Sequence, residues 1–205
     1  MRLPKRKIIG DIIVAGLLTA VFMFDGLSLL ELRLQDRVYQ QLGQIHPDIV
    51  VIGIDEQAIE TFGAPSRWRR SLMADAVKLL NSVPGYAPAV IALDILYVGE
   101  SDDADADQQL AEAARIGGNV VTAARVMIGD VRAPDNPLRT VNAVVGFEKP
   151  FDALAQNAAY GHVGAVFDND NIVRSAVFQY VNAIDGETMH SFPYEIAKKA
   201  MGNGA

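Results

Sequence analysis

Two aspartates stand at the ends of short apolar runs. Asp55 follows the run 49–54, and Asp94 follows the run 90–93. Both runs are too short and too rich in β-branched residues to favour a helix, so we predict buried strands. Such carboxylates can bind a cation, an amine or a sugar hydroxyl, and a pair with separated pKa values can act as acid and base. The simpler alternative is that each carboxylate caps the helix or loop after its strand.

The segment between the aspartates predicts how they are placed. Residues 70–82 have the apolar spacing of an amphipathic helix. Strand, helix and strand in succession favour a parallel pair with a right-handed crossover. Asp55 and Asp94 would then emerge at one edge of the sheet, which is where open α/β sheets bind ligands.

An aromatic and basic cluster lies between the two runs. Trp68 is flanked by Arg67, Arg69 and Arg70. These side chains could hold an anion or stack on a ligand ring. A surface turn is the alternative, with Trp68 packed on the sheet and Arg70 starting the helix. In a third interpretation, one of the arginines pairs with Asp55 or Asp94.

Two acidic stretches have simpler explanations than a metal site. Asp103, Asp105 and Asp107 alternate as in an EF-hand loop, but the glycine and the bidentate glutamate of that loop are missing. We therefore expect a solvated helix N-terminus, where acidic side chains are favoured. Asp168 and Asp170 precede Arg174, and a hairpin turn explains them without calcium.

No further chemistry is indicated. The three histidines lack metal-ligand spacing, no phosphate loop or nucleophile elbow is present, and there is no cysteine. We expect no cofactor and no metal. The net charge of −7 argues against a nucleic-acid partner.

The remaining pattern predicts one mixed α/β domain with a central sheet flanked by helices. Further helices are expected at 56–62, 110–116, 151–159 and 191–201. Strands are expected at 119–127, 143–147, 162–167 and 172–181, and an exposed loop at 129–140. Residues 168–171 form the expected hairpin turn.

The N-terminus is expected to anchor the chain in a membrane. Four basic residues in 1–7 precede an apolar stretch, and residues 12–24 carry no charge. A bilayer core takes roughly 20 helical residues, so Asp11 and Asp25 must lie at the two interfaces. We predict a cytoplasmic tail at 1–7, a transmembrane helix at 8–26 and an extracytoplasmic domain at 27–205. A cleaved signal peptide and a buried helix of a soluble protein are the alternatives. Beyond the span, Leu27, Leu30, Leu34 and Val38 recur at helical spacing and predict a stalk or a surface helix.

The order of motifs resembles the type-two CHASE domain, an extracellular sensory module of bacterial cyclases and histidine kinases. The similarity covers about residues 27–201. Its motifs are LELRLQD at 30–36, the run 49–55 with Glu56, WRRS at 68–71, IALDILY at 91–97, Asp107 with Leu110 and Ala111, and Gly161 followed by Asp168, Asp170, Val173 and Arg174. The family usually has a Trp-Pro-Trp-Pro-Arg-like segment, of which only Trp68 and Arg70 match. Asn171 stands at a usual glycine.

The resemblance implies a bacterial receptor of the inner membrane with its domain in the periplasm. It implies a small-molecule or periplasmic protein signal, a homodimer through membrane-proximal helices, and a cyclase or kinase output beyond this chain. Because similar proteins continue past such a domain, we expect a fragment. Candidate ligand-binding residues are Asp55, Trp68, Arg70, Asp94 and Arg174. A membrane-anchored periplasmic hydrolase using Asp55 and Asp94 is the alternative function, and a structural envelope protein is a third.

Overall fold

The chain folds into two compact units, residues 1–54 and 55–205. The structure, a computed structural model, describes residues 10, 13–17, 19–20, 28–39, 46–168 and 170–202. Among these residues, no helix is both long enough and apolar enough to cross a membrane. The predicted tail at 1–7 and most of the predicted span at 8–26 lie outside the described residues.

The described part of the first unit contains the helix expected after residue 26 but not the expected strand. Helix α2 spans Ser28–Tyr39, with an acidic side chain in its first turn and a basic one in its last, as the helix dipole favours. Residues 49–54 form no strand, and Val50 and Val51 are 81% and 79% exposed. The prediction of a buried strand before Asp55 is therefore wrong. An apolar run becomes a strand only where a neighbouring strand pairs with its backbone, and composition does not reveal that neighbour.

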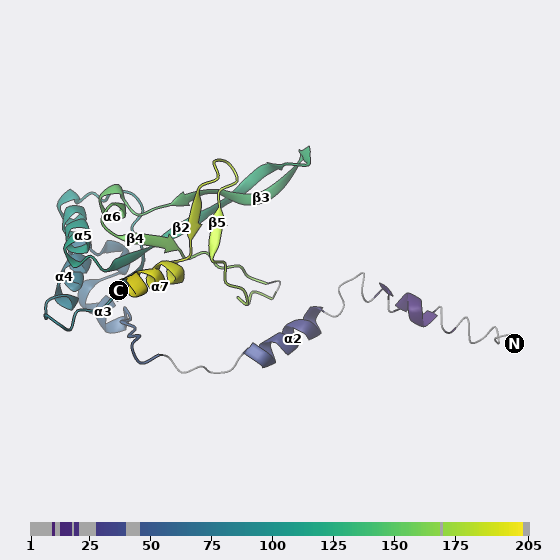
Figure 1. The fold of residues 1–205 in the computed structure, drawn as a ribbon, viewed down its shortest axis with the longest axis horizontal. Helices are drawn as coiled ribbons and strands as arrows, with labels where there is room; N and C mark the ends of the chain where they lie inside the picture. The colour runs from purple at the N-terminus through teal and green to yellow at the C-terminus, as the bar shows by residue number, and fades with distance from the viewer. Residues whose placement is uncertain are drawn as a thin grey trace. The chain divides into compact units, whose positions relative to one another are not determined.

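The second unit is built on a mixed sheet with β2 at its centre (Figure 1). β2 spans Val120–Ala133. Its first half pairs in parallel with β1 (Ile91–Leu96) and with β4 (Ala159–His162), and its second half pairs antiparallel with β3 (Asn136–Glu148). The parallel crossover exists, but it connects β1 to β2 through α5 (Ala104–Gly117). The predicted parallel pair of strand 49–55 with strand 90–94 is wrong.

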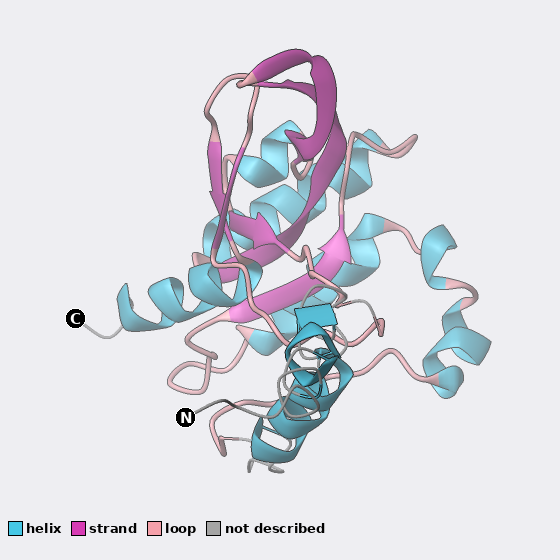
Figure 2. Cartoon of the chain, turned by 90° about the vertical axis from the view of Figure 1, so that its right-hand side faces the viewer, coloured by secondary structure: helices cyan, strands magenta, loops and turns pink. Residues whose placement is uncertain are grey.

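The long β2–β3 hairpin replaces a predicted loop. Residues 129–140 were expected to be an exposed loop, but only Pro134 and Asp135 form the turn, and Ala133 pairs with Asn136. Figure 2 shows β2 and β3 side by side as a long hairpin. Turn-forming residues favour a loop, whereas the length of the flanking strands depends on cross-strand pairing, so the prediction of a loop holds only for the two residues of the turn.

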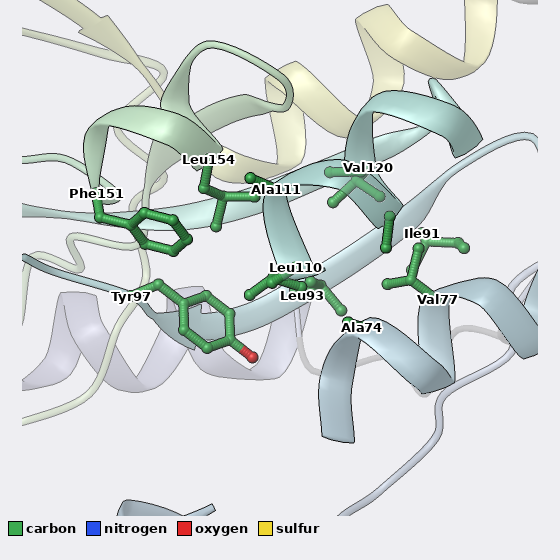
Figure 3. Packing of buried hydrophobic residues seen from close by; sticks show 12 residues of the cluster. Ala74, Val77, Ile91, Leu93, Tyr97, Leu110, Ala111, Val120, Phe151 and Leu154 are labelled. Atoms are coloured by element: carbon green, nitrogen blue, oxygen red, sulfur yellow. The ribbon is translucent and has the colours of Figure 1, made fainter. Parts of the chain in front are cut away.

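The core of this unit lies between β1, the start of β2, and three helices. α4 (Arg70–Leu80) packs along α5, and α5 packs on the short α6 (Asp152–Ala155). Figure 3 shows how aliphatic side chains from α4, α5, α6 and both strands meet the rings of Tyr97 and Phe151. The predicted helix at 70–82 is confirmed, the one at 110–116 starts earlier than expected, and the one at 151–159 is shorter.

The C-terminal part is a small hairpin followed by a helix. β5 (Gln179–Val181) pairs with β6 (Thr188–His190), and α7 (Phe192–Gly202) packs against β4 and β2. β4 ends at His162, so the predicted strand at 162–167 is wrong except for its first residue and for one bridge beyond β4, between Val166 and Ser175. The predicted strand at 172–181 is confirmed only as β5.

Candidate functional site

Arg70 is the centre of a largely buried polar cluster. It is the first residue of α4, and its side chain is 13% exposed. Its Nη1 donates to Asp107 Oδ1 at 3.0 Å and its Nη2 donates to the carbonyl of Gly99 at 2.8 Å. The guanidinium thus ties the start of α4 to the loop after β1 and to the first turn of α5.

Asp107 accepts hydrogen bonds from Ser101 as well as from Arg70. It is only 4% exposed. Its Oδ2 accepts from the Ser101 backbone N–H at 2.8 Å, and its Oδ1 accepts from the Ser101 hydroxyl at 2.6 Å. A buried carboxylate is tolerated when it is paired and hydrogen-bonded in this way. The expectation of a solvated helix N-terminus is wrong for Asp107.

Two aromatic rings cover the guanidinium. Arg70 Cζ lies 4.5 Å from the ring centroid of Phe151 and 5.6 Å from that of Tyr97, within cation–π range. Figure 3 shows both rings at the same end of the core. Burial raises the pKa of Tyr97 to about 12, although the positive charge of Arg70 acts in the opposite direction. The Tyr97 hydroxyl therefore stays protonated at neutral pH.

A second pair lies on the exposed side of this cluster. Arg69 Nε donates to Asp103 Oδ2 at 2.7 Å, and Asp103 also caps α5 by accepting from the Ala106 N–H at 3.1 Å. The hydrogen bond from Arg69, followed by that from Ala106, lowers the pKa of Asp103. Both arginines therefore pair with acids of the α5 N-terminus, not with Asp55 or Asp94 as one interpretation held.

Trp68 is held in a local turn. Its Nε1 donates to the carbonyl of Gly63 at 2.7 Å, and its ring meets Phe62 edge-on with the centroids 5.8 Å apart. Gly63 and Phe62 end α3 (Glu56–Phe62), and the 3₁₀ turn Pro65–Arg67 connects them to Trp68. These contacts give Trp68 a structural role and leave it half-buried.

The two strand-end aspartates have different surroundings from those predicted. Asp55 is the N-cap of α3, where its Oδ1 accepts from the Ala58 N–H at 2.9 Å. The capping alternative is therefore confirmed for Asp55. Asp94 lies inside β1, not after it, and its side chain is exposed. Among the described residues, Asp55 and Asp94 therefore do not share a strand edge as predicted.

Arg174 closes a compact hairpin. Its Nη1 donates to Asp168 Oδ2 at 2.9 Å, and its Nη2 donates to Asp170 Oδ2 at 2.7 Å. The hydrogen bond from Arg174 lowers the pKa of Asp170 to about 2. Asn171 adopts a φ of 62° in the turn, so the expected turn at 168–171 is confirmed. The strands expected on either side of it are reduced to the bridge between Val166 and Ser175 and to β5.

The sequence reasoning missed Ser101 and Phe151 and assigned Asp107 to solvent. A signal for Asp107 was present, since Ala106, Leu110 and Ala111 mark a buried face of α5 and Asp107 adjoins that face. No residue pattern identified Ser101 or Phe151, because their contacts cross between distant segments. Among the described residues, no three histidine or acidic side chains are grouped so that they could hold a metal ion.

Comparison with known proteins adds one match. The family model of the CHASE2 domain matches residues 13–205. No curated protein and no solved structure matches the chain. The match covers the whole second unit and helix α2, so it includes both the Arg70 cluster and the Arg174 hairpin.

Proposed function

We propose that this chain, which belongs to the CHASE2 domain family, is the extracytoplasmic sensory domain of a bacterial membrane receptor. The observation that carries the proposal is the family match over residues 13–205, because CHASE2 domains are extracellular sensory domains usually attached to cyclases and kinases. The receptor's output would be a C-terminal nucleotide cyclase or histidine kinase.

The proposed topology places the N-terminus in the cytoplasm and the domain in the periplasm. It rests on the basic residues of segment 1–7 before the apolar stretch from residue 8, the pattern of the positive-inside rule. An alkaline phosphatase fused after residue 202 of the chain should be active in living cells. A fusion after residue 7 should be inactive, and equal activity of both fusions would contradict the topology.

The proposed signal is a small molecule or a periplasmic protein. Among the five candidate ligand-binding residues, Arg70 and Arg174 already bind acids within the domain, whereas Asp94 is exposed on β1. Asp94 is therefore the candidate best placed to contact a ligand without local unfolding of the domain. Binding can shift signalling only if the ligand favours one of two receptor arrangements.

The proposed receptor is a homodimer through its membrane-proximal helices. Leu34 and Val38 are four residues apart on α2, and both are exposed. Apolar side chains at this spacing form one face of a helix and can pair with the same face of a second copy. Replacing both residues with serine should reduce the amount of receptor dimer that a chemical cross-linker captures in membranes.

Nothing in the described residues favours the hydrolase alternative. Asp55 is engaged as a helix cap, and Asp94 lies within a strand. A hydrolase would need both carboxylates around one substrate.

The deciding experiment joins residues 1–202, followed by a transmembrane helix that returns the chain to the cytoplasm, to an adenylate cyclase module in cyclase-deficient bacteria and measures cyclic AMP. We expect the cyclic AMP level to change when fractions of a periplasmic extract are added to spheroplasts. Asp94→Asn should reduce that change. Asp75→Asn, at an exposed aspartate of α4, is the matched control and should leave the change intact. An output that no fraction alters would contradict the sensory role, and equal effects of both variants would contradict the role of Asp94.

A further inference from the structure

His162 is buried without hydrogen-bond partners. It is the last residue of β4 and 1% exposed, and among the described residues neither ring nitrogen has a hydrogen-bond partner. A neutral imidazole carries one donor and one acceptor, and an imidazolium carries two donors. Each such group buried without a partner destabilises the folded state. Burial is therefore costly for the neutral ring and far more costly for the charged one.

The groups around His162 come from all the elements packed on β4. From β2, its register partner is Ala124, and Val126 lies near Gly164 beside it. From β5, the ring of Tyr180 meets the imidazole edge-on, with the centroids 4.6 Å apart. These neighbours supply no carboxylate to the imidazole.

The remaining neighbour is a second histidine. Burial lowers the pKa of His162, and the electrostatic effect of His190 on β6 lowers it further. α7 holds His190 in place, because its Tyr194 stacks on the ring at 4.5 Å and its Glu195 lies 3.3 Å from Nδ1. Glu195 therefore faces His190.

His162 lies at the junction of β4, β6 and α7. A bridge pairs it with Ser191, and the Ser191 N–H donates to the carbonyl of Phe178 at 2.8 Å. At the preceding residue, a Cβ added to Gly161 would lie 2.7 Å from the backbone nitrogen of Phe192. The first turn of α7 is thus in direct contact with β4, and a change at His162 must be accommodated there.

We propose that His162 is an acid-sensitive latch, whose protonation releases β4 from β6 and from the first turn of α7. Among the residues that the structure describes, the closed arrangement offers an imidazolium no acceptor, so the proton can be taken up only when the junction opens and water reaches the ring. Closure is then favoured above the ordinary histidine pKa and is lost as the pH falls below it. The latch is a property of the fold and goes beyond the proposed signalling role.

The size of the effect follows from linkage. When the junction is open, the ring titrates near the ordinary histidine pKa of about 6.5, whereas the closed ring stays neutral. The equilibrium constant for opening is therefore about ten-fold larger at about pH 5.5 than at about pH 7.5. This is the upper limit, reached when the closed ring takes up no proton at all. Local opening of this kind is visible as faster amide exchange confined to one segment.

The test measures amide hydrogen exchange of the full chain in detergent at both pH values, corrected for intrinsic exchange rates. Peptides over 159–163 and 189–195 should lose several-fold to ten-fold protection at the lower pH, whereas peptides of α5 should not. His162→Phe keeps a ring against Tyr180 without nitrogens and should abolish the acid response. His162→Gln, which also cannot titrate, serves the same purpose if the phenylalanine variant fails to fold.

The other two histidines provide the controls, since the chain has three. His46→Gln should keep the full response, and His190→Gln should keep at least a several-fold response. A wild-type chain with unchanged protection at the junction would overturn the proposal. So would an acid response that survives in His162→Phe or disappears in His190→Gln alone.

Discussion

Removing the charge of Asp107 should be the most damaging conservative change in this domain. In Asp107→Asn, the guanidinium of Arg70 loses the carboxylate that it pairs with at 3.0 Å while remaining 13% exposed beside two aromatic rings. The new amide nitrogen must also face a donor, either Arg70 or the N–H of Ser101. Breaking a buried pair from one side costs about 3–5 kcal/mol.

The structure places the expected cost at the lower end of that range. Arg70 keeps its hydrogen bond to the carbonyl of Gly99 and its aromatic contacts, so we expect a loss of about 3 kcal/mol. With a urea m-value of about 2 kcal/mol/M for a domain of this size, the unfolding midpoint should fall by about 1.5 M. Urea titration followed by circular dichroism measures this shift directly.

Asp105→Asn is the matched control for this prediction. Asp105 belongs to the same first turn of α5 but is exposed, so its charge contributes only through the helix dipole, by less than about 1 kcal/mol. A double-mutant cycle with Arg70→Met should give a coupling energy of about 2 kcal/mol. Equal losses of stability in Asp107→Asn and Asp105→Asn, or a coupling energy near zero, would refute the conclusion that the buried pair of Arg70 and Asp107 stabilises the fold.

Three further predictions concern the C-terminal half. Gly161→Ala places a Cβ 2.7 Å from the backbone of Phe192, so thermal unfolding should show a loss of about 1–3 kcal/mol from overpacking. Asn171→Ala puts a side chain without local hydrogen bonding at a φ of 62° and should cost about 1 kcal/mol in the same assay. Because Arg174 lowers the pKa of Asp170 to about 2 from the ordinary 3.8, the ionised form favours folding above the ordinary value. Its contribution should disappear as the pH falls toward about 2, and acid titration of Asp170→Asn should lack that portion of the profile.

Each of these has a control and an opposing outcome. Gly202→Ala adds a Cβ with nothing within 4 Å and should be close to neutral, so similar losses at both glycines would count against the contact with α7. Asn171→Gly should be at least as stable as the natural chain, and a greater loss than in Asn171→Ala would be inconsistent with the turn. An acid profile unchanged in Asp170→Asn would show that its pairing with Arg174 does not contribute to folding.

Several features of the fold could be predicted because local interactions produce them. α4 and α7 follow from apolar residues at helical spacing. The end of α5 follows from Gly118 in the left-handed conformation, and the hairpin turn follows from Asn171. In each case the hydrogen bonds that form the element join residues a few positions apart, so the local sequence contains the necessary information. The family resemblance over about residues 27–201 depended on the order of such motifs, and the family match over residues 13–205 confirms it.

Other features depended on contacts between distant segments. The apolar run 49–54 has the composition of a strand but no strand partner among the described residues, whereas residues 129–140 have loop-like composition and pair along most of their length. The sequence offered Arg70 two plausible acids, and the fold paired it with a third, 37 positions away. The exclusion of His162 from hydrogen bonding likewise depends on β2, β5 and β6 together.

The sequence by itself determined the family, the main helices and the turns, and it identified Arg70 and Arg174 as residues of interest. Only the tertiary structure decided that these arginines bind acids within the domain, that Asp55 caps a helix, and that Asp94 remains exposed on β1. The physical reason is that a charged side chain carries the same chemistry at any position. Which partner neutralises it depends on packing that brings distant backbone segments within hydrogen-bond distance.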